Sequence, residues 1–209
     1  MKTLKVLFGF VLLNIITACS ASDPDAVLKQ VFNEKEVILV NQIISYYDNY
    51  VLSKTDENKS IKDAYQAFMS KNALSALKAG DLTIFATSRK ELTALFETLD
   101  NDVFSNLFNI DENYPYQVQI IYPKYLEFMK VLSTRNDFYF SYYNKFEAVG
   151  DISPSIYSDI FSMYDEHPEG KKYSETFDFS KKEDRFSFII PFLVTHENTN
   201  HEGMYSILR

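Results

Sequence analysis

The sequence has few of the side chains on which catalytic and cofactor sites usually depend. Its 209 residues include 1 cysteine, 3 histidines, 5 glycines and no tryptophan. A single cysteine excludes an intramolecular disulfide. The chain contains neither a glycine-rich phosphate loop nor the G-x-S-x-G pattern of a serine nucleophile. Sparse glycine favours a fold that consists mainly of helices.

Positive charge is also scarce. The chain has 21 Lys and Arg against 29 Asp and Glu, for a formal net charge of −8. Because nucleic-acid binding needs clustered positive charge, we expect no nucleic-acid partner. Electrostatic binding to anionic lipid is disfavoured for the same reason. The 18 Phe and 15 Tyr could form a platform for sugars or peptides, but their helical spacing favours a role in the core.

The first residues have the pattern of an export signal. Lys2 and Lys5 form a short basic start, and residues 6–13 form an apolar stretch that Ile15 and Ile16 continue. A basic start, an apolar centre and small residues before a cleavage site are typical of a secretory signal peptide. The apolar stretch is shorter than the roughly 20 residues that a membrane-spanning helix requires.

The end of this segment, Ile16-Thr17-Ala18-Cys19, resembles the lipobox of bacterial lipoproteins. The resemblance implies that a diacylglycerol is attached to the Cys19 thiol, that signal peptidase II cuts before this residue, and that Cys19 carries palmitate-type lipid. It also implies a lipid-anchored place in the cell envelope. Ser20 is not the aspartate that retains enterobacterial lipoproteins in the inner membrane, so the outer membrane is favoured.

Three segments follow from this assignment. Residues 1–18 are expected to be the lipoprotein signal peptide, residues 19–23 the lipidated cysteine and a short tether, and residues 24–209 a single helical domain. Loss of Lys2 and Lys5 with the signal changes the formal net charge to about −10. About 190 residues remain, which is enough for one sizeable core.

Apolar residues then recur at helical spacing along most of the chain. We expect an all-α fold, an irregular bundle of six to eight amphipathic helices. Capping residues and helix-ending glycines predict the boundaries. The predicted starts are Ser22-Asp23-Pro24-Asp25, Ser60, Ser88, a position near Tyr116 or Pro123, Asn136 or Asp137, and Ser153-Pro154; the predicted ends include Gly80 and Gly150. Residues 100–116 are expected to form a loop-rich connector with short helical pieces.

The C-terminal region allows two interpretations. Ser180 and Glu183 match a capping box for a helix through Phe192, in which Pro191 would produce a kink. Alternation of aromatic and polar residues indicates instead two strands, which would form a small β-hairpin near the C-terminus. The alternating residues are Phe177, Phe179, Phe186 and Phe188. The helix is favoured.

The densest set of ligand-type side chains lies in residues 196–202. The candidate metal ligands are His196, Glu197, His201 and Glu202. The two histidines are five residues apart rather than four as in H-E-x-x-H, so on a helix their rings would point about 140° apart. A solvated polar tail is therefore the favoured interpretation. Acidic pairs such as Glu183-Asp184 are likewise expected to be solvated charge.

These features favour a non-enzymatic envelope lipoprotein that binds a partner, for example another envelope protein, and they predict no cofactor. One alternative is a membrane-tethered, metal-dependent hydrolase that uses the His196/His201 region. Another alternative is an immunity or inhibitor lipoprotein that binds a basic toxin. Salt should then weaken the binding, because it screens the attraction between opposite charges.

Overall fold

The computed structural model describes residues 23–79, 89–110, 118–152, 155–156, 159–160 and 176–199. Within this part of the chain seven α-helices account for most residues, which confirms the all-α class and the expected number of helices. The elements in chain order are the 3-10 helix η1 (Leu28–Gln30), α1 (Glu34–Lys54), α2 (Ile61–Ala79), α3 (Arg89–Thr98), α4 (Asn101–Leu107), β1 (Phe108–Ile110), β2 (Val118–Ile120), α5 (Tyr122–Leu132), α6 (Asp137–Val149) and α9 (Lys182–Thr199).

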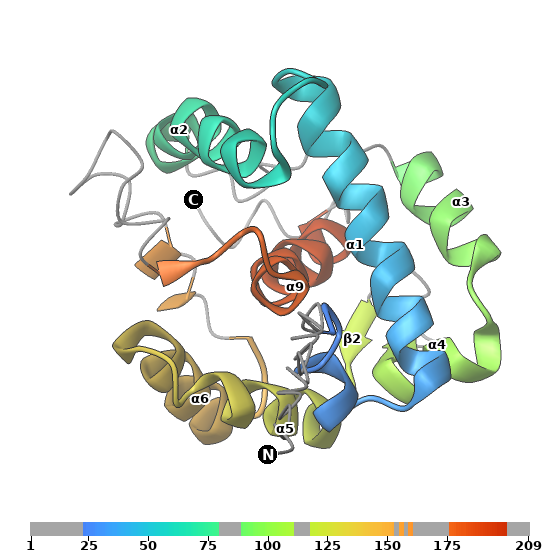
Figure 1. Cartoon of the computed structure of the whole chain (residues 1–209). Coiled ribbons are helices and arrows are strands. Elements are labelled where there is room, and N and C mark those ends of the chain that lie inside the picture. The colour runs from blue at the N-terminus through green and yellow to red at the C-terminus, as the bar shows by residue number, and fades with distance from the viewer. Residues whose placement is uncertain are drawn as a thin grey trace, which may run out of the picture.

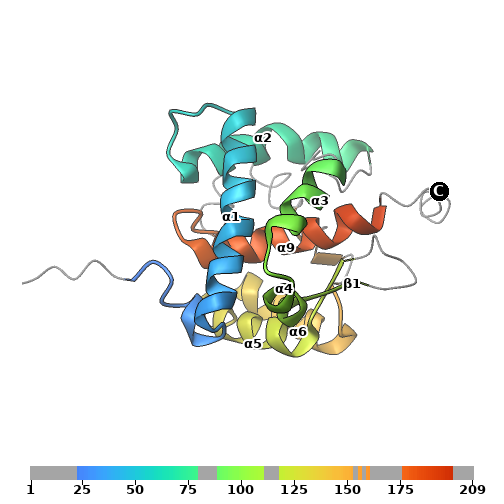
Figure 2. The same ribbon diagram turned by 90° about the vertical axis from the view of Figure 1, so that its right-hand side faces the viewer.

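Helix α9 is the central element of the bundle. Figure 1 views it nearly end-on, with α1 on one side, α2 above and α5 and α6 below. In Figure 2, turned by 90°, α9 runs across the middle of the molecule between α2 and the α5–α6 pair. Residues 183–193 are all buried. From Phe186 to Leu193 the buried residues are apolar except Ser187, so this part of the helix has no polar face.

The first long helix starts later than its sequence indicates. The predicted start at Ser22-Asp23-Pro24-Asp25 is wrong, because residues 24–27 form turns that lead into η1. Helix α1 begins after Asn33, whose Oδ1 accepts a hydrogen bond from the Glu36 backbone N at 3.0 Å. The Glu36 carboxylate accepts in return from the Asn33 backbone N at 2.9 Å. Two free helix donors are satisfied reciprocally, which makes this the stronger helix start.

Other predicted boundaries are confirmed. Ser60 Oγ accepts from the Asp63 backbone N at the start of α2, and Asn136 Oδ1 accepts from the Tyr139 backbone N at the start of α6. Gly150 ends α6 at a φ of 78°, a conformation that side chains with a Cβ rarely adopt. The helix expected near Tyr116 or Pro123 begins at Tyr122. Gly80, Ser88 and Ser153-Pro154 lie outside the described residues.

The β-hairpin in the described part of the chain lies between α4 and α5 rather than near the C-terminus. Strands β1 and β2 pair antiparallel, with Phe108 opposite Ile120 and Ile110 opposite Val118. They lie in and just after the predicted connector, of which α4 is the helical piece. The C-terminal segment forms helix α9 instead of strands, as favoured. Its predicted cap is wrong, because Ser180 Oγ donates to Asp178 Oδ1 at 2.7 Å and Glu183 pairs with Arg135.

Aromatic rings fill the space around α9. Phe188 is fully buried, and its ring centroid lies 5.2 Å from that of Phe179, 5.3 Å from that of Phe177 and 6.0 Å from that of Tyr65. These contacts are edge-to-face, a geometry that aromatic pairs favour. Tyr65 belongs to α2 and Phe188 to α9, so the rings join segments distant in sequence. Much of the unusual Phe and Tyr content is therefore core.

We predict that Phe188→Ala destabilises the protein by about 3–5 kcal/mol, because it removes a ring from the centre of this cluster and leaves a cavity. Chemical denaturation monitored by circular dichroism measures the effect. Phe140→Ala on α6 is the matched control, since Phe140 is 58% exposed. The control should change the free energy of unfolding by less than about 0.5 kcal/mol. Similar losses in both variants would contradict the central position of α9.

Candidate functional site

The structure does not test the candidate metal ligands. His201 and Glu202 lie outside the described residues, as does Cys19. His196 and Glu197 belong to the C-terminal part of α9, of which only the backbone is described. Among the described side chains no group of three His, Cys, Asp or Glu residues is placed to hold a metal ion. Similarly, no helix in the described part of the chain is long and apolar enough to cross a membrane.

An open groove of about 500 Å³ lies between α1 and α3. The two helices lie side by side on one flank of the molecule (Figures 1 and 2). Seven described residues line the groove: Ile38, Asn41, Gln42, Ser45 and Tyr46 on α1, and Leu95 and Thr98 on α3. The described lining is thus uncharged, although 24% of the residues in the chain are Asp, Glu, Lys or Arg. It combines aliphatic side chains with amide and hydroxyl groups.

Two residues of α1 give the groove its character. Ile38 is 61% exposed, which is unusual for a large aliphatic side chain. Asn41 contributes an Oδ1 atom that is buried and has no hydrogen-bond partner in the structure. Leaving a buried acceptor unsatisfied costs roughly 1–3 kcal/mol. The exposed aliphatic surface of Ile38 is the feature of the groove that a bound partner could cover.

The sequence does not indicate the groove. Leu39, Ile43 and Tyr46 recur at helical spacing and form the predicted core stripe of α1, and Ile38 and Asn41 lie off that stripe. An isoleucine outside the core stripe is only a weak indication of a binding surface, because single exposed apolar residues are common on protein surfaces. The groove becomes visible only when α3 is placed against α1.

A network of buried charges lies at the start of α9. Arg135, between α5 and α6, places its guanidinium 2.5 Å from Glu183 Oε1 and 2.9 Å from Asp184 Oδ2. The Tyr139 hydroxyl donates to Asp184 Oδ1 at 2.5 Å and lies 2.9 Å from Ser187 Oγ. Glu183 and Asp184 are 4% and 2% exposed. The prediction that this acidic pair is solvated is therefore wrong.

A second polar contact joins α1, α2 and α9. Arg185 Nε lies 3.1 Å from Asp48 Oδ1, and the Tyr65 hydroxyl donates to the same oxygen at 3.0 Å. Arg185 Nη1 also donates to the Phe179 carbonyl at 2.7 Å. Burial raises the pKa of the Asp48 carboxyl, although the Arg185 charge opposes the shift. Because these charged groups face one another across helix interfaces, we assign them to stability.

The pKa of Asp184 is raised to about 6. Burial is the main cause, because it penalises the ionised carboxylate, and the negative charge of Glu183 acts in the same direction. The hydrogen bond from Tyr139 and the charge of Arg135 oppose the shift. The folded state therefore binds a proton at Asp184 at a pH where an unfolded chain would have released it.

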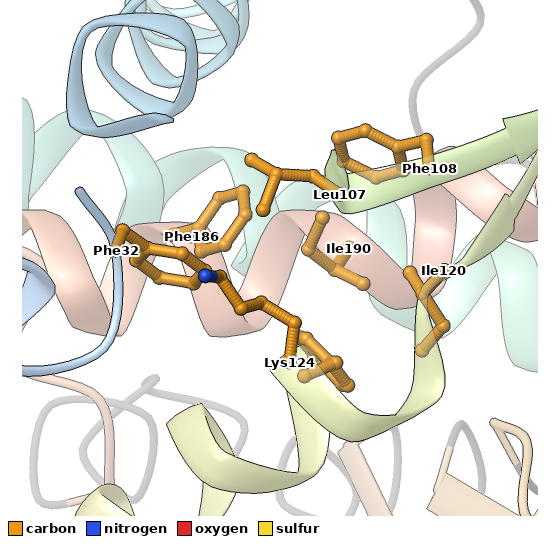
Figure 3. A pocket seen from close by; sticks show the side chains of 8 residues that line it. Phe32, Leu107, Phe108, Ile120, Lys124, Phe186 and Ile190 are labelled. Carbon is orange, nitrogen blue, oxygen red and sulfur yellow. The ribbon is translucent and has the colours of Figure 1, made fainter. Parts of the chain in front are cut away.

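A small cleft of about 10 Å³, shown in Figure 3, lies between Phe32, the end of α4, the hairpin, α5 and α9. Its lining is apolar apart from Lys124 and Tyr125; the other lining residues are Phe32, Leu107, Phe108, Ile120, Phe186 and Ile190. Lys124 Nζ lies 3.0 Å from Glu36 Oε2, the carboxylate that also caps α1. This ion pair neutralises the one cationic group among the described lining residues. We interpret the cleft as imperfect packing.

Comparison with models of protein families, with curated proteins and with solved structures finds no match. A functional proposal therefore depends on the export motif and on the geometry of the groove.

We predict that Asp184 makes the protein more stable in mild acid. Because its pKa is raised from 3.8 to about 6, its stabilising contribution is complete below about pH 3.8 and is lost as the pH rises through about 6. The shift corresponds to a fall of about 3 kcal/mol in the free energy of unfolding. Urea denaturation between pH 4 and pH 7 should show this fall in the wild type and a smaller one in Asp184→Asn.

Asp178→Asn is the control for this experiment. A hydrogen bond from Ser180 lowers the pKa of Asp178, so this carboxylate contributes in the opposite direction, with stability that is lost as the pH falls. Its removal should leave the decline between pH 4 and pH 7 intact or steeper. An Asp184→Asn variant with the wild-type pH dependence would contradict the assignment to Asp184.

Proposed function

We propose that the chain is a bacterial envelope lipoprotein, held at the membrane by lipid on Cys19, whose helical domain binds a partner protein and does not act as an enzyme. The observation that carries the proposal is Ile16-Thr17-Ala18-Cys19, behind a basic start and an apolar stretch. Cys19 is the only cysteine in the chain. Two or more acyl chains on such a residue give stable anchoring, at about 0.8 kcal/mol for each buried methylene.

The described fold begins close behind this anchor. Asp23 accepts from Lys29 Nζ at 2.7 Å, and Asp25 pairs with Lys182 of α9 at 2.8 Å. Leu28 is fully buried. If Cys19 carries the lipid, the four residues from Cys19 to Ser22 reach at most about 14 Å when extended. The domain would therefore stay next to the membrane, with the outer membrane favoured because Ser20 follows the cysteine.

Two structural observations favour binding over catalysis. The charged side chains at the start of α9 are engaged with one another: Arg135 with Glu183 and Asp184, and Arg185 with Asp48. The groove between α1 and α3 instead presents exposed aliphatic surface beside amide and hydroxyl side chains. Concave surfaces of this kind, with a few polar groups that set orientation, are typical of binding sites.

We predict that Cys19→Ala abolishes lipidation, because no other thiol is available to accept the diacylglycerol. The variant should take up no labelled palmitate in growing bacteria and should leave the membrane fraction. Radiolabelling followed by fractionation measures both effects. Ser20→Ala keeps the thiol and should be labelled like the wild type. Undiminished labelling of Cys19→Ala would disprove the lipoprotein assignment.

We also predict that a partner contacts the groove in the intact envelope. A photo-crosslinking amino acid at position 38, in the full-length chain, should yield a discrete adduct upon irradiation, because Ile38 is an exposed lining residue of the groove. The same amino acid at position 140 is the control, since Phe140 is comparably exposed on α6. Gel electrophoresis and mass spectrometry identify the adduct. Equal adducts at both positions, or none at position 38, would exclude the groove as the binding surface.

A further inference from the structure

The segment behind Cys19 is fastened to the fold soon after it begins. Asp25 Oδ1 lies 2.8 Å from Lys182 Nζ, at the start of α9. The Phe32 ring is buried, and its centroid lies 5.9 Å from that of Phe186, which is also on α9. These contacts fix the entry of the chain at the N-terminal end of α9.

The β-hairpin lies toward the other end of α9. Ile190 lines a cleft together with Phe108 and Ile120 of the hairpin. In Figure 2 the first described residues, in blue, lie at one end of α9, and β1 lies near the opposite end. Helix α9 has 18 residues and is about 27 Å long. This length is nearly twice the roughly 14 Å that the four residues from Cys19 to Ser22 can span.

A lipid on Cys19 would therefore hold the entry side of the fold close to the membrane. The hairpin could approach the lipid only if the whole domain lay on its side. The distribution of charge decides between these two arrangements.

Two segments form the entry side, residues 23–32 and residues 176–182, which we call the anchor end. Together they carry three acidic and three basic side chains and are neutral. The charged residues are Asp23, Asp25, Lys29, Asp178, Lys181 and Lys182. The remainder of the chain behind the signal peptide thus carries the whole acidic excess, a formal charge of about −10. Anionic lipid repels that remainder more strongly than it repels the anchor end.

We infer that the domain stands upright on the membrane, with the anchor end against the lipid surface and the β-hairpin directed away from it. The inference rests on the proposed lipid anchor and specifies which part of the fold meets the membrane. It does not depend on what the groove between α1 and α3 binds.

The chain contains no tryptophan, so a single introduced tryptophan is a unique fluorescent probe. Gln30→Trp places the probe at the anchor end and Asn109→Trp places it on β1, and both positions are exposed. The lipidated full-length chain is added to vesicles of phosphatidylethanolamine and phosphatidylglycerol. The vesicles also contain a phosphatidylcholine with a nitroxide on its headgroup, which quenches only nearby fluorophores. We expect position 30 to lose most of its fluorescence and position 109 to keep nearly all of it.

A longer tether is the control. About eight glycine and serine residues inserted between Ser22 and Asp23 raise the reach of the tether from about 14 Å to about 42 Å. The acidic domain can then move away from the lipid. The tryptophan at position 30 should regain most of its fluorescence, while the chain stays bound to the vesicles.

Two results would overturn the inference. Equal quenching at positions 30 and 109, or stronger quenching at position 109, would show that the anchor end does not face the lipid. Quenching at position 30 that the longer tether leaves unchanged would show that the introduced tryptophan itself inserts into the membrane.

Flotation on a density gradient separates this inference from the proposed function. A wild-type chain that does not float with the vesicles lacks the anchor, which would remove both proposals. A chain that floats but is quenched equally at the two positions would leave the lipoprotein proposal standing and remove only the orientation.

Discussion

The structure depends on the enclosure of α9. Residues 183–193 are buried on all sides, so this helix has no face that could remain in water if its neighbours were absent. Its first turn nevertheless carries Glu183, Asp184 and Arg185. Buried charges are tolerated only when they are paired and hydrogen-bonded. Arg135 and Tyr139 at the start of α6 and Asp48 on α1 provide these partners, so the same contacts that neutralise charge on α9 also join it to α6 and α1.

The residues that stabilise the core and the residues of the proposed binding surface are largely different. The charged residues at the start of α9 are paired within the fold, although Arg185 Nε is buried without a hydrogen-bond partner, and burial of Asp184 is the main cause of its raised pKa. The groove between α1 and α3 differs in that it has exposed aliphatic surface. Helix α1 contributes to both: Val40, Ile43 and Tyr47 are buried in the core, while Ile38 and Asn41 face the groove. If Cys19 carries lipid as proposed, a partner bound in the groove would be held near the membrane.

Local signals predicted local structure well. Ser60, Asn136 and Gly150 form caps because each needs only residues within one helical turn. The start of α1 was misplaced because two local signals compete there, and the reciprocal bonds of Asn33 and Glu36 prevail over the turn at Asp23-Pro24. The acidic pair Glu183-Asp184 was misjudged for a different reason. Its burial depends on Arg135, 48 and 49 residues away in sequence, and no local pattern encodes such a contact.

The sequence alone determined the all-α class, since apolar spacing and sparse glycine depend only on helix geometry and backbone freedom. It also predicts the export signal and the lipid on Cys19, because such motifs are recognised as linear segments. Only the tertiary structure decided that α9 lies at the centre, that its charges are buried, and that α1 and α3 form a groove around Asn41. The physical reason is that burial and hydrogen-bond satisfaction are properties of pairs of elements.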